Sequence, residues 1–143
     1  MPQELRAQIA AEARAAYPQE CCGLIEGVRE HGAARALAVH PTANYSPEPD
    51  AFEIDPAAHL RLLRTLRGTG REIVGCYHSH PGGGPTPSIR DRENGGTEDI
   101  IWVIAALTDP AAAPSFSAYE GLSFRELSLT EQPALEVARP RQL

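Results

Sequence analysis

The sequence predicts a single α/β domain in which a mixed β-sheet is flanked by helices. At 143 residues the chain has room for one hydrophobic core. Segments of helical periodicity alternate with short β-prone runs, in the order helix, three strands, helix, strand, short helix and three strands. We expect the domain to span residues 1–130, with 131–143 as a polar tail.

The N-terminal segment predicts a helix over residues 3–16. Three apolar side chains recur there at helical spacing and define one buried face, namely Leu5, Ile9 and Ala13. Pro18 ends the helix, because proline lacks the backbone donor that a further turn needs.

Two β-prone runs follow this helix. We expect one strand over residues 21–28 and a second strand from 35–39, paired as a hairpin through a turn at 29–34. Residues 44–50, NYSPEPD, form a proline-broken acidic loop, and 51–54 have the character of a short third strand.

A second helix is predicted immediately after this region. Asp55 is suited to the N-cap and Pro56 to the first helical position, and Gly68 ends the helix after about Arg67. Three leucines are expected on its inward face, Leu62, Leu63 and Leu66.

The second half of the chain supplies the remaining strands. Residues 71–77, REIVGCY, form a β-prone run that is too short for a helix. Residues 100–107, IIWVIAAL, are the most apolar run and suit a central strand buried on both faces. Residues 115–119 and 124–129 alternate well enough for a hairpin through 120–121.

The composition restricts the partners and the compartment. A formal charge of −6 and a pI near 5.3 argue against binding to a nucleic-acid backbone. No stretch has the length of a membrane span, and we recognise no signal peptide. The three cysteines, an odd number, do not make a disulfide framework. We therefore expect a cytoplasmic protein with reduced thiols.

The most informative segment is residues 77–91, YHSHPGGGPTPSIRD. If the preceding strand continues to residue 80, His78 and His80 point to the same side, because strand side chains alternate. Both imidazoles can then reach one metal ion. Pro81 and the three glycines after it end the strand and let the chain turn back over the histidines.

Ser88 and Asp91 admit two compatible interpretations. As structural residues, a serine N-cap with an acid at N3 is close to a capping box, which would open a helix through about Asn94. As functional residues, Asp91 in the first helical turn can be a third ligand beside two imidazoles. Zinc bound by three protein ligands keeps its fourth position for water, so a metal held by these three side chains would form a catalytic rather than a structural site.

This segment resembles the signature of the JAMM (MPN+) zinc metalloproteases, which is H-x-H-P, six residues, then S-x-x-D. Every fixed position of that signature is present at residues 78–91. The family also has an upstream glutamate, often in an E-x-C-G context ahead of a strand, and residues 20–23, ECCG, are similar to it. The resemblance extends from about Leu5 to about Leu129 and implies the MPN, cytidine-deaminase-like fold.

The resemblance also implies the chemistry of the site. It assigns Zn²⁺ to His78, His80 and Asp91. Glu20, which alone would be interpreted as a solvated acid, becomes the general base, and Ser88 becomes the donor to the oxyanion. The implied substrate is the bond after the C-terminal Gly-Gly of a ubiquitin-like or sulfur-carrier protein, with release of cysteine or another amine. Residues 44–54 would neighbour the groove for that tail, or else form a plain surface loop.

Three other interpretations belong to different classes. A JAMM endopeptidase could act on a phage-tail or cell-wall substrate. A non-catalytic MPN scaffold is disfavoured by the complete site set, and an iron oxygenase gives no role to the H-x-H-P loop or the upstream glutamate. The remaining histidines are interpreted as a solvated turn residue, a strand-end residue and a helix residue that either packs or lies on the outer surface, in the order His31, His40 and His59. Cys22 and Cys76 are interpreted as packing residues.

Overall fold

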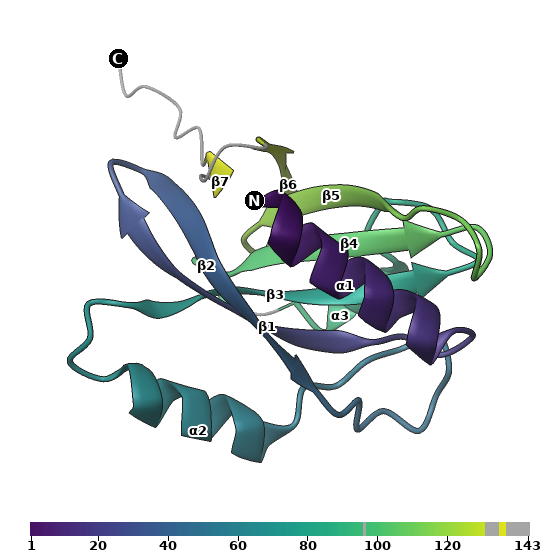
Figure 1. Cartoon of the computed structure of the whole chain (residues 1–143), viewed down its shortest axis with the longest axis horizontal. Helices are drawn as coiled ribbons and strands as arrows, with labels where there is room; N and C mark the ends of the chain where they lie inside the picture. The colour runs from purple at the N-terminus through teal and green to yellow at the C-terminus, as the bar shows by residue number, and fades with distance from the viewer. Residues whose placement is uncertain (96, 131–134, 137–143) are drawn as a thin grey trace.

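The computed structural model describes residues 1–95, 97–130 and 135–136, and within them it contains the predicted sheet and helices (Figure 1). The elements in chain order are α1 (Gln3–Ala16), β1 (Cys22–Glu30), β2 (Ala33–Thr42), α2 (Pro56–Leu66), β3 (Glu72–Pro81), α3 (Ile89–Glu93), β4 (Ile101–Leu107), β5 (Ser115–Glu120), β6 (Arg125–Leu129) and β7 (Leu135–Glu136). None of the described helices is both long enough and apolar enough to cross a membrane.

The strands follow the order β1-β2-β7-β6-β5-β4-β3, and β3 pairs with β1, so the sheet closes on itself. Only the described pair β3–β4 is parallel, which makes the sheet mixed as predicted. The closure was not predicted, because it passes through β7, two residues within the expected tail. Residues 131–134 and 137–143 of that tail lie outside the described residues.

Two cores lie on opposite faces of the strands. One core joins α1 to one set of alternating strand residues, including Ile25, Tyr77 and Val103. The other joins α2 to the intervening residues, including Leu24 and Trp102. Every residue of β4 is buried, as its continuous apolar run predicts.

Three local predictions are corrected by the structure. Leu63 is 48% exposed. Of the three leucines, only Leu62 and Leu66, which are four positions apart, lie on the stripe of α2 that faces the sheet. The β1–β2 turn is only residues 31–32, both with positive φ, which matches the twist of a tight hairpin. Residues 51–54 form no strand, and Ile54 makes an isolated bridge with Asn44.

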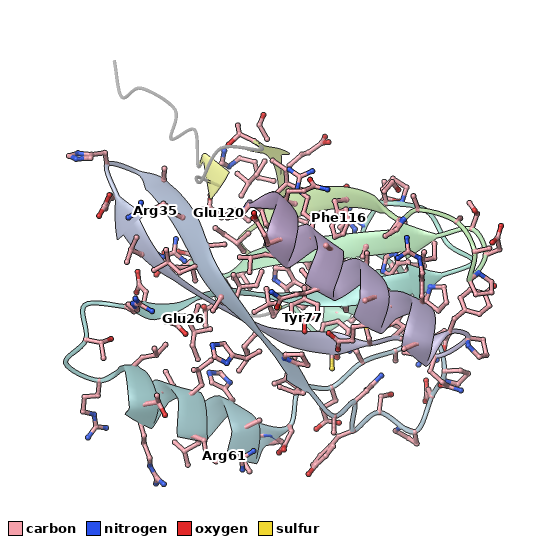
Figure 2. All side chains as sticks on the ribbon, viewed as in Figure 1. Glu26, Arg35, Arg61, Tyr77, Phe116 and Glu120 are labelled. Atoms are coloured by element: carbon pink, nitrogen blue, oxygen red, sulfur yellow. The ribbon has the colours of Figure 1, made fainter. Side chains whose placement is uncertain are left out.

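The antiparallel pairing of β1 with β3 positions the site. Cys22 lies opposite His78 and Gly23 lies opposite Tyr77. Tyr77 points to the opposite face from His78 and reaches α1, where its hydroxyl donates to Glu12 Oε2 at 2.6 Å (Figure 2). The histidine therefore remains on the α2 side of the sheet.

Candidate metal centre and active site

Three predicted ligands converge at the end of β3. The strand runs through Pro81, so His78 and His80 share a face as the alternation requires. Their Nε2 atoms are 3.0 Å apart. Asp91, the third residue of α3, places Oδ1 3.1 Å from Nε2 of His78 and Oδ2 3.0 Å from Nε2 of His80. All three side chains are buried, so the ligand atoms form a compact cluster within the protein.

Neighbouring groups orient these side chains. The Nδ1 atom of His80 lies 2.8 Å from the carbonyl oxygen of Gly84, so an N–H there turns the lone pair of Nε2 toward the cluster. Ser88 and Asp91 form the predicted capping box, in which the Ser88 amide donates to Oδ2 and the Asp91 amide donates to the Ser88 hydroxyl. The capping box is therefore confirmed, and it leaves Asp91 directed at the two histidines, as the functional interpretation requires.

The ring of His78 is enclosed by aromatic side chains. Phe52 stacks on it with ring centroids 4.2 Å apart, and Trp102 meets it edge-on at 5.9 Å. Among the described residues no hydrogen-bond partner reaches Nδ1 of His78. Burial lowers the pKa of His78 and thereby favours the neutral ring that a metal requires.

The cluster fits a small tetrahedral cation. Zinc bound to imidazole nitrogen or carboxylate oxygen at about 2.0–2.1 Å separates its ligand atoms by about 3.3 Å, close to the separations of 3.0–3.1 Å found here. Burial opposes charge on Asp91, but hydrogen bonds from His78 and His80 outweigh it and hold the pKa of that carboxyl well below its usual range. Asp91 is therefore ionised, as a carboxylate ligand to zinc must be.

Glu20 lies beside this cluster. Because Cys22 pairs with His78, continuing the antiparallel register by two residues brings Glu20 opposite His80. Its side chain is 7% exposed, and Oε2 has no hydrogen-bond partner among the described residues. Burial raises the pKa of Glu20 to about 7, and the nearby Asp91 carboxylate contributes to the rise. This carboxyl can therefore exchange a proton near neutral pH.

Glu20, His80 and Ser88 line one pocket of about 560 Å³. The Ser88 oxygen accepts the Asp91 amide hydrogen at 3.0 Å, which leaves the hydroxyl hydrogen free to be donated. All five side chains predicted for the site thus lie around a single ligand cluster and its pocket.

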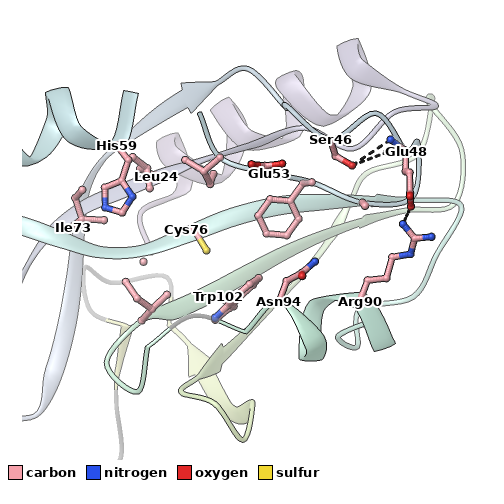
Figure 3. A pocket seen from close by; sticks show the side chains of 15 residues that line it. Leu24, Ser46, Glu48, Glu53, His59, Ile73, Cys76, Arg90, Asn94 and Trp102 are labelled. Atoms are coloured by element: carbon pink, nitrogen blue, oxygen red, sulfur yellow. Dashed lines mark hydrogen bonds and ion pairs between the residues drawn. The ribbon is translucent and has the colours of Figure 1, made fainter. Parts of the chain in front are cut away.

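A second pocket of about 530 Å³ adjoins the first (Figure 3). Most of its wall is apolar and includes Leu24, Phe52 and Trp102. Arg90 lines both pockets and pairs with Glu48 of the 44–54 segment. Phe52 and Trp102 also contact His78, so the second pocket shares its wall with the ligand cluster.

The fold and this site agree with a match to a known family. The profile described as prokaryotic homologs of the JAB domain matches residues 2–120. The chain belongs to the prokaryotic JAB family. With its His-His-Asp cluster, this JAB domain is a peptidase of the JAMM type.

Individual relatives support the same assignment. The JAB domain is 34% identical over 113 residues to a desampylase of Haloferax volcanii, covering 78% of each chain. It is 28% identical over 100 residues to the CysO-cysteine peptidase of Mycobacterium tuberculosis, covering 70% of this chain and 67% of the relative. The structure of a JAB1/MPN domain protein from Archaeoglobus fulgidus superposes with a TM-score of 0.55, covers 87% of this chain and 91% of its own, and is 19% identical. The predicted MPN fold is thus confirmed.

Several residues that shape the site of this JAB domain were not predicted. Ser79, between the two histidines, accepts the Cys21 amide through its hydroxyl at 2.9 Å and donates its own amide to the Cys21 carbonyl at 3.1 Å. Phe52 covers His78. Ser79 could have been noticed as a polar residue at an inward strand position, whereas the sequence carries no local signal for Phe52.

The remaining histidines lie outside the ligand cluster, as predicted. His31 is in the β1–β2 turn, and His59 is exposed on α2. The Nε2 atom of His40 lies 2.8 Å from Glu26 Oε2. The three cysteines are free and buried.

Proposed function

We propose that this chain is a zinc-dependent hydrolase that cleaves the amide bond after the C-terminal Gly-Gly of a ubiquitin-like or sulfur-carrier protein. The observation that carries the proposal is the convergence of His78, His80 and Asp91 beside the buried carboxyl of Glu20, whose Oε2 has no hydrogen-bond partner among the described residues. A buried carboxyl next to three ligand atoms is the arrangement that metal-assisted hydrolysis requires.

We assign the metal ligands to His78, His80 and Asp91. Zinc bound there would lower the pKa of a water molecule from about 15.7 to near 7 and polarise the scissile carbonyl. Glu20 accepts the proton of the attacking water and returns it to the leaving amine, a role worth roughly 10²–10⁴ in rate. A nearby cation favours the charged form of Glu20 and offsets the effect of burial on its pKa.

Ser88 is assigned to the oxyanion. Its oxygen is already engaged as an acceptor for the Asp91 amide, so the hydroxyl hydrogen can point to the carbonyl oxygen of the substrate as negative charge develops there. Removal of one such donor typically lowers kcat by about 10²–10³. The capping box keeps this hydroxyl in place without an additional side chain.

The substrate assignment rests on the relatives and on the second pocket. The two relatives are named a desampylase and a CysO-cysteine peptidase, and we carry this kind of substrate over to the present chain as a proposal. The pocket beside His78 is mostly apolar and shares Arg90 with the Glu20 pocket, an arrangement that suits an extended tail whose last two residues lie at the cluster. The free, buried thiols accord with the proposed cytoplasmic location.

The test uses a small β-grasp carrier whose tail ends in Gly-Gly-Cys. Zinc-loaded protein should release free cysteine and leave a carrier ending in Gly-Gly, as measured by mass spectrometry. The Glu20→Gln variant should bind zinc normally and cleave at least about 100-fold more slowly. Cleavage of phage-tail or cell-wall proteins with no action on the carrier would replace this substrate by the endopeptidase alternative, and a wild-type protein that binds no zinc would refute the hydrolase.

A further inference from the structure

Two residues of the segment between β2 and α2 reach the site. Phe52 stacks on His78 at 4.2 Å between ring centroids. Asp50 lines the pocket that holds Glu20 and lies 3.7 Å from the guanidinium of Arg90. This segment is therefore part of the wall around the ligand cluster, although it forms no helix or strand of its own.

One side chain at the start of the segment, Asn44, makes four hydrogen bonds. Its Nδ2 donates to the carbonyl oxygen of Glu20 at 3.0 Å and to that of Ala51 at 3.0 Å. Its Oδ1 accepts the amides of Ser46 at 2.9 Å and Glu53 at 3.0 Å. Two carbonyls on one side and two amides on the other fit only one orientation of the amide group. Every strong bonding position of this side chain is thus directed to the backbone.

The bond to Glu20 differs from the other three because it leaves the segment. Glu20 precedes β1, and no described residue bonds its Oε2 atom. The next residue, Cys21, is held by two hydrogen bonds to Ser79 on β3. The backbone around the proposed general base is therefore fixed on one side by the strand of the metal ligands and on the other side by Asn44.

We infer that Asn44 is a positioning residue that holds the Glu20 carboxyl at the metal cluster and couples its position to the segment that covers His78. This inference rests on the proposed function, because positioning has consequences only if Glu20 acts as the base. Misplacement of a catalytic group by about 1 Å can lower the rate by about 10². Loss of the Asn44 bonds should therefore lower kcat by about 10- to 100-fold while His78, His80 and Asp91 keep their zinc.

Two substitutions of Asn44 compare loss of its donor bonds, one of which holds Glu20, with loss of all its bonds. Asn44→Ala removes all four bonds, whereas Asn44→Asp keeps both acceptor bonds and replaces the donor to Glu20 and Ala51 with a carboxylate oxygen, which their carbonyl oxygens repel. Thr65→Ala is the matched control, since Thr65 also donates to a backbone carbonyl, that of Arg61, but on exposed α2. Values of kcat and KM should be compared on the pH-independent plateau, because the added carboxylate in Asn44→Asp raises the pKa of nearby acids.

The inference predicts a lowered kcat for both Asn44 variants, normal zinc content, and unchanged kinetics for Thr65→Ala. A double-mutant cycle adds the decisive readout. Asn44→Ala should lower single-turnover rates by its full factor in a Ser88→Ala background and by less than about threefold in a Glu20→Gln background. Equal factors in both backgrounds, or a wild-type kcat in Asn44→Asp, would overturn the inference.

A readout independent of activity separates this inference from the proposed function. A crystal structure of Asn44→Ala should show the Glu20 carboxyl displaced from His80 while the ligand cluster is unchanged. An undisplaced carboxyl would refute the role of Asn44 whatever the enzyme cleaves. Conversely, a zinc-loaded wild-type protein that cleaves no carrier tail, combined with a displaced carboxyl in the variant, would refute the proposed substrate and leave the positioning role supported.

Discussion

Gly23 is the residue of the E-x-C-G stretch whose replacement has the most readily calculated consequence. A Cβ atom at this position would lie 2.3 Å from the Tyr77 hydroxyl and 2.4 Å from Cζ of the same ring. Tyr77 is fully buried and donates to Glu12 on α1, so it has no free direction in which to move. Gly23→Ala must therefore displace the ring, the strand or the helix.

The expected destabilisation has two parts. Forcing an extra methyl group into a packed core typically costs about 1–3 kcal/mol. Displacing the Tyr77 hydroxyl from the Glu12 carboxylate removes a hydrogen bond to a charged group, worth about 1.5–3 kcal/mol in a buried setting and less here because Glu12 is only half-buried. We expect a loss of about 2–5 kcal/mol, a large share of the roughly 5–15 kcal/mol that stabilises a typical domain.

Urea unfolding of the zinc-free protein, followed by far-UV circular dichroism, measures this loss. Gly84→Ala is the matched control, because a Cβ atom there meets nothing within 4 Å. Tyr77→Phe removes the hydroxyl without adding a methyl group and should show the second part alone. If Gly23→Ala unfolds at the same urea concentration as Gly84→Ala, close packing against Tyr77 is not the reason for a glycine at this position.

Two further predictions concern the metal and pH. His80→Ala should weaken zinc binding by more than about 100-fold, because loss of a residue that only orients a metal ligand already weakens metal binding by about 10- to 100-fold. Elemental analysis measures the zinc content, and the control variant His31→Asn, in the exposed turn, should keep stoichiometric zinc. Glu26 is buried, and its hydrogen bonds from Arg71 and then His40 hold the pKa of its carboxyl below the ordinary value. Because this pKa is lowered in the folded state, the stabilisation is present above about pH 4.3 and is lost as pH falls through the folded-state value. Glu26→Gln should therefore flatten the loss of stability below about pH 5, and parallel urea midpoints for the two proteins across that range would contradict this assignment.

The parts of the site that could be predicted depend on local geometry. The alternation of a strand places His78 and His80 on one face, and the first turn of a helix places Asp91 three residues after its cap. Both rules act within a few residues, so the sequence alone suffices. The continuous apolar run of β4 predicts burial for the same reason.

The parts that could not be predicted depend on contacts between distant segments. Asn44 bonds the carbonyl of Glu20, 24 positions away, and nothing in the sequence NYSPEPD indicates that partner. β7 is only two residues long, too short for any periodicity to be visible. A composition rich in proline and acidic residues predicts a loop at 44–54, but it does not predict that the loop covers His78.

The register of β1 against β3 explains why a glutamate near the start of the chain serves a motif almost sixty residues later. In an antiparallel ladder without a bulge, the residue numbers of opposite residues have a constant sum, as the pairs Cys22 with His78 and Leu24 with Cys76 show. Glu20 therefore falls opposite His80 and on the same face. A slip of one residue would turn the carboxyl to the α1 side, where Cys21 packs in the other core. The close contact of Gly23 with Tyr77, and the two bonds between Cys21 and Ser79, oppose such a slip on the α1 face of the same strand pair. The packing on one face of the sheet thus fixes the distance between the proposed base and the proposed metal ligands on the other.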